Sequence, residues 1–525
     1  MLRSTFIVLF LIVFGCSNNT EPTSTQKVLT EVQILKASNP NYGDQFGVGG
    51  TLLGDAVAIS ADGSTLAVGA TFEASNSISN QEDNSFYGAG AVYVFTNQSG
   101  NWVQEAYLKP SNPGITDNFG YAVEISDDGD TLVVSSVFEA SSQTGINPDI
   151  EDEILPQAGA VYVFTRNAGS WSEEAYIKAP NTGHMPDDPM ALSDGDQFGF
   201  AVSINGAGNK LAIAAITEDS GATGVNGDMT DNSTVSAGAV YVYEKLESGW
   251  EFSDYLKASN AGGGDLFGYS VSFSQDGNTL AIGAYDEDGS LNGNNDIQDD
   301  DVNGMGAVYV FEDQADGWIQ TAYLKGSYQE RNDSIGVVVD ISADGRTLVS
   351  AALDEDSMMT GVNPVPEPDW ESDLSTGGVY VFVKGDNGQW TQEAYIKASN
   401  TGIEDIFGSR LELSPNGDEL IVGAQLEDSD SHGIEGDQSN DNAQEAGAAY
   451  LFTRENGEWT QQYFFKGSNT EAYDEFASTL STNFDGSIIA IGARGEDSSL
   501  AEDGSIQPED NSLLESGAVY IFTYQ

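Results

Sequence analysis

The residues with the clearest chemical potential in this sequence are carboxylates that recur at fixed places. A Glu appears seven times at the start of a polar stretch, and in five copies Asp follows it: Glu73, Glu139, Glu218, Glu287, Glu355, Glu427 and Glu496. Together these stretches hold 38 of the 83 acidic residues and no Lys or Arg. Carboxylates gathered in this way can bind cations or act as acid and base.

Two of the stretches contain the ligand type that Ca²⁺ prefers. "EDSGATGVNGDMTDN" at 218–232 and "EDSDSHGIEGDQSNDN" at 427–442 separate carboxylates by glycines, and Ca²⁺ needs six to eight converging oxygens. The candidate metal ligands are Glu218, Asp219, Asp228, Asp231, Glu427, Asp428, Asp430, Asp437 and Asp441. The alternative is that these loops are acidic only because they are solvated.

Other catalytic chemistry has little support in the sequence. The two histidines, His184 and His432, fall in separate stretches, and Cys16 is the one cysteine, so Cys- and His-based triads are absent. Paired carboxylates can hydrolyse glycosides, but seven near-equivalent copies argue against a unique acid and base, and we assign no catalytic residue. Trp370 lies in one acidic stretch, where it either stacks on a ligand or packs locally.

Two further residue types recur seven times beside these carboxylates. An Asp lies two residues before each Phe-Gly dipeptide or its equivalent, Ile335-Gly336 or Phe476-Ala477, at Asp44, Asp117, Asp196, Asp265, Asp333, Asp405 and Asp474. Seven of the eleven lysines end the strand before it, at Lys36, Lys109, Lys178, Lys257, Lys325, Lys397 and Lys466. Because an Asp before a strand commonly accepts N–H groups in a turn, the interpretation we favour for both rings is structural.

These side chains are positioned by a unit of about 70 residues that occurs seven times. A Gly-Ala-x-Tyr-x-Phe-like strand begins at Gly90, Gly159, Gly238, Gly306, Gly377, Gly447 and Gly517. Period-two alternation, aromatic and β-branched residues and Asp-Gly turns predict four antiparallel strands in each unit. The sequence therefore predicts an all-β, seven-bladed β-propeller over residues 28–525.

The ends of the chain predict how the ring closes. Residues 28–37 resemble the fourth strand of a unit although they precede the first unit, and the chain ends where an eighth such strand would begin. The N-terminal strand is therefore expected to complete the last blade and remove its free edge. In this topology the loops after the second and fourth strands share one face, here called the top face, and the short hairpins form the bottom face.

The repeat resembles the FG-GAP repeats of the integrin α-subunit propeller and of bacterial FG-GAP repeat proteins. The resemblance rests on the Phe-Gly dipeptides, on Gly-Ala after the second strand, as at Gly69-Ala70 and Gly283-Ala284, and on the Tyr-x-Phe strand. It implies a binding or adhesion module. The integrin calcium loop between the first two strands is not carried over, because its ligand positions are missing in the turn at 60–66.

The N-terminus resembles that of a bacterial lipoprotein. Arg3 and an apolar run too short to span a bilayer precede Val13-Phe14-Gly15-Cys16, which is similar to a lipobox. This resemblance implies that residues 1–16 are a signal peptide with Cys16 as the lipidated residue, that 17–27 form a polar tether, and that the protein is extracytoplasmic, in the outer membrane. An ordinary secretory signal is the alternative.

Charge limits the partners. With 18 basic and 83 acidic residues, the net charge of −65 would repel nucleic acid and anionic lipid, so we expect no nucleic-acid partner and membrane contact only through the anchor. We expect a non-catalytic, ligand- or protein-binding propeller, calcium-dependent if the acidic loops bind Ca²⁺, with a protein or glycan at its top-face loops. The alternatives are a carboxylate-dependent polysaccharide enzyme and a structural envelope protein.

Overall fold

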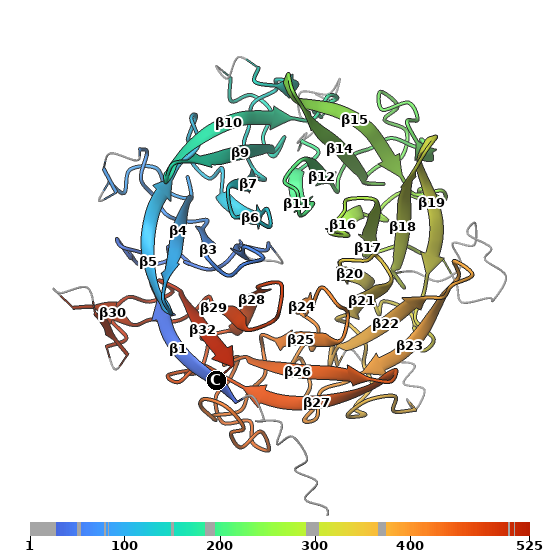
Figure 1. Ribbon diagram of the computed structural model, residues 1–525. Coiled ribbons are helices and arrows are strands. Elements are labelled where there is room, and N and C mark those ends of the chain that lie inside the picture. The colour runs from blue at the N-terminus through green and yellow to red at the C-terminus, as the bar shows by residue number, and fades with distance from the viewer. Residues whose placement is uncertain are drawn as a thin grey trace, which may run out of the picture.

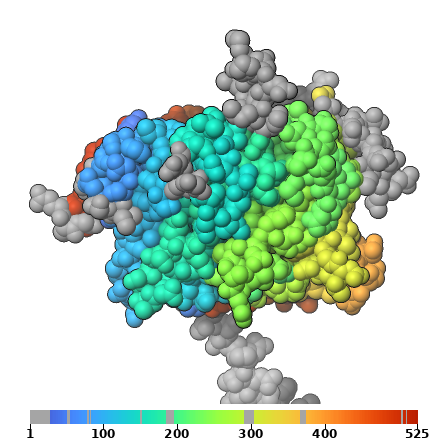
Figure 2. All heavy atoms as spheres, turned by 90° about the horizontal axis from the view of Figure 1, so that it is seen from above, coloured from blue at the N-terminus to red at the C-terminus, as the bar shows by residue number. Residues whose placement is uncertain are grey.

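The chain folds into a closed ring of seven blades around a central axis (Figure 1), and the region about this axis, where the first strands of the blades lie, is here called the central channel. The computed structural model describes residues 28–49, 54–77, 80–81, 83–148, 152–183, 195–289, 304–365, 374–501, 505–508 and 510–524. Within these ranges every regular element is a β-strand. Seen from the side, neighbouring blades pack against one another without a gap (Figure 2). The predicted all-β, seven-bladed propeller is confirmed.

Each blade is an antiparallel sheet whose first strand lies near the channel and whose fourth strand lies at the periphery (Figure 1). In blades 1 to 4 the strands are β2 Val57–Ile59, β3 Thr65–Ala70, β4 Ala91–Gln98 and β5 Asn101–Leu108; β6 Phe119–Ile125, β7 Thr131–Ser136, β9 Ala160–Asn167 and β10 Ser170–Lys178; β11 Phe198–Ile204, β12 Lys210–Ala215, β14 Ala239–Leu246 and β15 Gly249–Lys257; β16 Phe267–Phe273, β17 Thr279–Ala284, β18 Ala307–Gln314 and β19 Gly317–Leu324. In blades 5 to 7 they are β20 Ile335–Ile341, β21 Thr347–Ala352, β22 Gly378–Lys384 and β23 Trp390–Ile396; β24 Arg410–Leu413, β25 Glu419–Ala424, β26 Ala448–Glu455 and β27 Glu458–Phe465; β28 Phe476–Thr482, β29 Ile488–Ala493, β32 Ala518–Tyr524 and β1 Leu29–Leu35.

The ring is closed by the two ends of the chain. Strand β1 pairs with β32 in antiparallel register, with Leu29 opposite Tyr524 and Leu35 opposite Val519. It thus takes the outer position in blade 7, where β10 or β15 lies in other blades. The predicted closure by the N-terminal strand is confirmed.

Backbone contacts between the Gly-Ala and Phe-Gly dipeptides join neighbouring blades. The N–H of Phe119 donates to the carbonyl of Ala89 in the preceding blade. A Cβ added to Gly90 would lie 2.0 Å from the carbonyl oxygen of Phe119, so this glycine permits the close approach. At all seven boundaries a Cβ added to this glycine would lie 2.0–2.3 Å from the carbonyl oxygen of the Phe or Ile in the next blade. This includes Gly517 and Phe46, which join blade 7 to blade 1.

Aromatic side chains fill the space behind each of these contacts. Phe119 packs edge-on against Tyr162 and Phe164, with ring centroids 5.4 and 6.0 Å apart, and all three are buried. Equivalent sets occur in the other blades that have Phe at this position. Such pairs contribute about 0.5–1.5 kcal/mol beyond their buried area, which explains why the Tyr-x-Phe pattern repeats.

Some loops after the second strand form additional strands that the sequence pattern does not predict. In blade 2, β8 (Gly145–Ile146) pairs with β10, and in blade 3, β13 (Gly224–Val225) pairs with β15. In blade 7, β30 (Ser499–Leu500) and β31 (Ile506–Gln507) form a separate hairpin. Within the described ranges, no helix is long and apolar enough to cross a membrane.

Removing β1 tests the closure. A chain that begins at Ser38 lacks this strand, so the outer edge of β32 is left unpaired and open to association with other chains. We expect a lower melting temperature and concentration-dependent aggregation, measured by scanning fluorimetry and light scattering. A chain that begins at Lys27 keeps β1 and serves as the control. Equal melting temperatures and equal monodispersity of the two chains would contradict the closure.

Candidate functional site

The recurring Glu and Lys residues pair with each other inside every blade. Lys178 Nζ lies 2.5 Å from Glu139 Oε2, and both side chains are fully buried. Equivalent pairs join Lys36 to Glu496, Lys109 to Glu73, Lys257 to Glu218, Lys325 to Glu287, Lys397 to Glu355 and Lys466 to Glu427, with at most 8% of any side chain exposed. Burial lowers the pKa of Lys178, and the charge of Glu139 opposes that shift.

An Asn three residues after the Lys connects each Glu to the preceding blade. Asn112, which follows blade 1, donates to Oε1 of Glu139 in blade 2 at 3.3 Å and accepts from the hydroxyl of Tyr162 at 2.7 Å. The same Asn-to-Glu and Tyr-to-Asn bonds occur at Asn39, Asn181, Asn260, Asn400 and Asn469. At the boundary of blades 4 and 5, Tyr328 stands in place of the Asn. In the other six blades the Glu is therefore bonded both within its own blade and to the connection from the preceding one.

The Asp ring has the structural role that the sequence favours. Asp117 accepts the backbone N–H of Gly114 at 2.8 Å, and each of the other ring Asp residues likewise accepts an N–H from the turn before its strand. Burial raises the pKa of Asp117 to about 7, and the charge of Glu139 raises it further. Burial likewise raises the pKa of Asp333 and of Asp474 to about 8.

The predicted calcium ligands of blade 3 are engaged in bonds within the protein. Glu218 binds Lys257, and Asp219 accepts the N–H of Ser236 at 2.8 Å. Asp228 accepts from Thr230, and Asp231 accepts the N–H of Gly221 at 3.1 Å. These bonds fold the loop back on itself.

The ligands of blade 6 follow the same scheme. Glu427 binds Lys466, Asp428 accepts the N–H of Glu445, Asp430 accepts from Asn442, and Asp437 accepts from Ser439; Asp441 lies in the same loop. Among the residues that the structure describes, no three His, Cys, Asp or Glu side chains gather closely enough to hold a metal ion. Calcium binding stays a prediction.

The central channel contains charged residues that sequence reasoning missed. Arg410, on β24, is buried, and its Nε lies 3.4 Å from Asp55 Oδ1. Asp340 accepts the N–H of Leu413 at 2.7 Å and the hydroxyl of Ser272 at 2.9 Å, and burial raises its pKa to about 6. Burial raises the pKa of Glu124 well above its usual value, and the charges of Asp55 and Asp340 add to this. These groups come from blades far apart in the sequence, so spacing alone could not find them.

Aromatic rings line part of the same channel. Tyr121, Phe200 and Tyr269 each stand two residues after the Phe of Phe-Gly, and they continue to Phe138 and Tyr285, with adjacent centroids 4.8–6.4 Å apart. The signal available in the sequence was this repeated aromatic position in blades 2 to 4. One cavity here, which Glu124, Phe200, Tyr269 and Arg410 help to line, measures about 40 Å³, room for roughly three water molecules.

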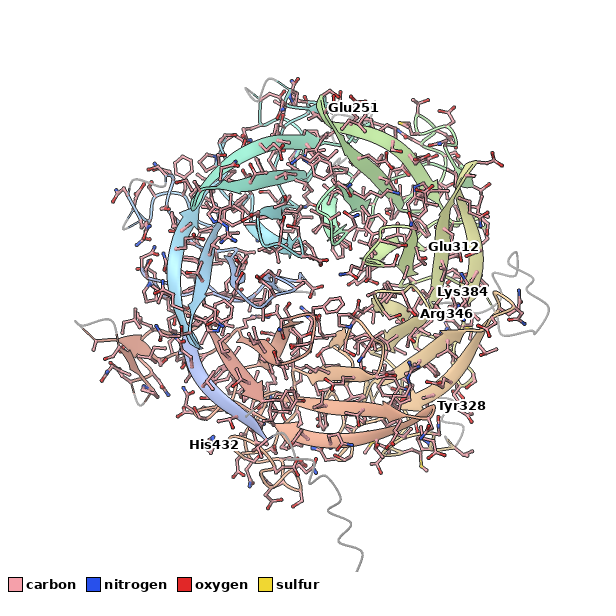
Figure 3. All side chains as sticks on the ribbon, viewed as in Figure 1. Glu251, Glu312, Tyr328, Arg346, Lys384 and His432 are labelled. Atoms are coloured by element: carbon pink, nitrogen blue, oxygen red, sulfur yellow. The ribbon has the colours of Figure 1, made fainter. Side chains whose placement is uncertain are left out.

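The remaining residues considered in the sequence analysis lie away from the channel or outside the ranges that the structure describes. His432 lies on the outer side of the ring (Figure 3). Cys16, the tether 17–27, His184 and Trp370 all fall outside the described residues.

Breaking one buried ion pair tests its role. In Lys178→Met the carboxylate of Glu139 stays buried without its cation, so we expect the free energy of unfolding to fall by about 3–5 kcal/mol. Lys245→Met removes the partly exposed pair with Glu174 and should cost about 0–1 kcal/mol. Chemical denaturation measures both. Equal losses in the two variants would show that the buried pair has no special role.

The Asp ring predicts an unusual pH dependence. Because the pKa of Asp117 is raised to about 7 in the folded protein, the folded state binds a proton that the unfolded chain releases above about pH 4. The contribution of Asp117 to stability should therefore fall as the pH rises from about 4 to about 7. Asp117→Asn keeps an acceptor oxygen for Gly114 and should raise the melting temperature at pH 8.5 more than at pH 5.5, whereas Asp316→Asn, at an exposed turn, should change neither. An unchanged pH dependence in Asp117→Asn would count against the raised pKa.

Comparison with known proteins supports the repeat. Residues 102–164 and 250–311 match the FG-GAP repeat family. Each match runs from the fourth strand of one blade, across the boundary, to the third strand of the next. Among curated proteins, none matches this chain.

Several solved structures resemble the chain at low identity. A putative 6-phosphogluconolactonase from Bacteroides uniformis shares 10% identity over 78% of this chain and 85% of its own, with a TM-score of 0.43. The periplasmic gluconolactonase PpgL of Pseudomonas aeruginosa shares 16% over 83% and 88%, with a TM-score of 0.43. A chain of a mitotic checkpoint complex shares 11% over 99% and 98%, with a TM-score of 0.46. Such likenesses say nothing of activity or partners.

The two matched segments share their Trp, Tyr-x-Phe and Phe-Gly residues with the other units, and the structure gives these residues the same places in the ring. The protein is therefore a seven-bladed β-propeller that contains FG-GAP repeats, and this arrangement fits an integrin α-like FG-GAP propeller.

Proposed function

We propose that this protein is a non-catalytic binding or adhesion propeller, anchored in the cell envelope through Cys16, that takes a protein or glycan ligand on its acidic top-face loops. The proposal rests on the observation that the buried carboxylates serve the fold, whereas the loops beyond them differ from blade to blade. The seven recurring Glu residues and the ring Asp residues are buried and bonded within the fold, whereas the loops beyond them differ between blades in length and sequence. Blade-specific exposed loops on a rigid scaffold are a common basis for recognition.

The exposed part of these loops is acidic. Asp228, Asp430, Asp437 and Asp441 all have exposed side chains. Their charge favours a ligand with basic groups, since complementary charge speeds encounter and disfavours wrong partners. A cationic protein surface or an amino sugar would satisfy this requirement.

Charge distribution supports an orientation with the top face away from the bilayer. Strand β1 starts at the bottom face, and the eleven tether residues before it span at most roughly 40 Å when extended. From the recurring Glu onward, the loops after the second strands contain no Lys or Arg, whereas the bottom face carries Arg166, Lys210, Lys245, Arg346, Lys384 and Arg454. Lys384 pairs there with Glu312 of the neighbouring blade (Figure 3). Repulsion from anionic head groups is least in this orientation.

The alternative of a polysaccharide enzyme has one observation in its favour, the asymmetric channel with carboxyl groups of raised pKa. The small volume of the cavity that Glu124 helps to line counts against it. A structural envelope protein without a specific ligand is the third candidate, and it differs from the first in having no saturable ligand.

A binding screen separates these functions. The purified protein would be applied to a glycan array and used as bait in pull-downs with envelope proteins. Each experiment would be run with about 2 mM Ca²⁺, which exceeds the dissociation constants of about 10⁻⁴–10⁻³ M of weak extracellular sites, and with chelator. We expect a saturable ligand whose affinity falls in the triple variant Asp430→Asn, Asp437→Asn, Asp441→Asn, and chelation should lower the melting temperature if the loops hold Ca²⁺.

Replacement of Asp316, an exposed bottom-face residue, by Asn is the matched control and should bind normally. Turnover of a captured glycan would favour the enzyme, and an affinity unaffected by the triple variant would place the ligand elsewhere. An identical melting curve with chelator and with calcium, at equal ionic strength, would remove the calcium prediction.

A further inference from the structure

The outermost strand of a propeller blade has an unpaired edge, and four blades of this protein cover it in the same way. In blades 2 and 3 the short strands β8 and β13 pair with the ends of β10 and β15. In blades 5 and 6, Val362 and Ile434 bridge to Ile396 and Phe465 at the equivalent positions. The covering segment is Gly-Ile-Asn, Gly-Val-Asn, Gly-Val-Asn and Gly-Ile-Glu in turn.

The hydrogen bonds of this cover are constant. In blade 3, Asn226 donates its N–H to the carbonyl of Tyr255 at 2.7 Å, and its Oδ1 accepts the N–H of Tyr255 at 2.9 Å. The same two bonds join the third residue of the covering segment to Tyr176, Tyr395 and Phe464. The end of a fourth strand therefore accepts an extended segment with a glycine and a β-branched residue.

In blade 7 the described residues, which leave out 502–504 and 509, show no such cover. The loop of this blade forms the hairpin β30–β31, which stands outside the ring next to β1 and β5 (Figure 1). Ile34 on β1 occupies the position of Tyr255, since it lies opposite Tyr520 as Tyr255 lies opposite Tyr241. Among the residues that the structure describes, its outward N–H and C=O have no partner. In blades 1 and 4, parts of the corresponding loops fall outside the described residues.

A groove lies between β1 and this hairpin. It measures roughly 630 Å³, within the range of ligand clefts, roughly 300–1,000 Å³. Strand β1 forms one wall, and the apolar side chains that line the groove come from β1, from blade 1 and from the hairpin with the residue after it: Ile34, Leu35, Phe95, Leu500, Ile506 and Pro508. Residues 499–511, which contain the hairpin, include four acidic residues and no Lys or Arg.

We propose that this groove binds an extended segment of a partner protein, which adds to β1 as an antiparallel strand. The segment has a glycine followed by Val or Ile, as in the four covered blades, and basic residues at its ends to complement the acidic hairpin and the net charge of −65. Main-chain bonds to Ile34 give the affinity, and the apolar pocket beside Ile506 selects the side chain. The hairpin belongs to the acidic loop of blade 7, whereas the test of the proposed function replaces acidic residues in blade 6, so the two proposals can fail separately.

A synthetic peptide tests the groove. The fluorescent probe Lys-Ala-Thr-Gly-Val-Asn-Gly-Lys carries the covering segment of blade 3 between two lysines and is titrated against the purified full chain by anisotropy. We expect saturable binding, weakened at least about tenfold in Ile506→Asp, because a charge in the apolar wall must be desolvated. Leu514→Asp, an exposed leucine of the same blade outside the groove, is the matched control and should bind like the unchanged protein.

Hydrogen exchange gives a second readout that does not depend on a variant. The peptide should slow amide exchange in residues 28–38 but not in 170–178, where β8 already covers the edge. The proposal is overturned by the absence of saturable binding, by equal affinity in Ile506→Asp, or by protection elsewhere. It is also overturned if the free protein sediments as a dimer that Ile506→Asp dissociates, because the occupant would then be a second copy of this chain.

Discussion

In each blade a lysine from the outermost strand reaches a glutamate at the end of the second strand, in a place that water does not reach. Removing two such charges from water costs several kcal/mol for each ion, and an ion pair alone does not offset this. The offset needs further hydrogen bonds, and here they come from the neighbouring blade. In blade 2, Glu139 accepts from Lys178, from Asn112 of the preceding connection and from Tyr176. The charge is stable only when two blades are in place.

This dependence explains how a chain with a net charge of −65 forms a compact ring. The repeated carboxylates are either paired with lysine or, in the Asp ring, held where burial favours the protonated form. A further 31 acidic residues lie in the loops after the second strands. The scaffold is therefore nearly identical from blade to blade, while the loops vary without disturbing it. That separation is what a recognition surface requires.

Much of the fold follows from the sequence because its signals are local and repeated. The Tyr-x-Phe strand, the Phe-Gly dipeptide and the Asp-Gly turn each appear several times, so the blade number and the closure by residues 28–37 could be predicted. The pairing of Glu139 with Lys178 was not predicted, although both residues had been identified, because strand pairing and not spacing brings them together. The bridging Asn112 and the two-residue strand β8 were missed because a single Asn or a two-residue strand can be recognised only when the residues that it bonds to are known.

The candidate site divides in the same way. The amino-acid composition identifies the acidic loops. It does not predict the bonds of Asp219 and Asp231 within their own loop, because these bonds depend on the backbone conformation of the loop. The channel was missed altogether, because Asp55, Glu124 and Arg410 come from three blades. A lining built from single residues of distant units leaves no pattern that can be read along the chain.

The central claim is that the seven blades stabilise one another through these buried clusters and form one cooperative unit. Differential scanning calorimetry of the chain from Lys27 onward tests it most directly, through the ratio of the calorimetric to the van't Hoff enthalpy of unfolding. The account predicts a single transition with a ratio of about 1. Several resolved transitions, or a ratio of several, would show that blades unfold separately and would contradict it.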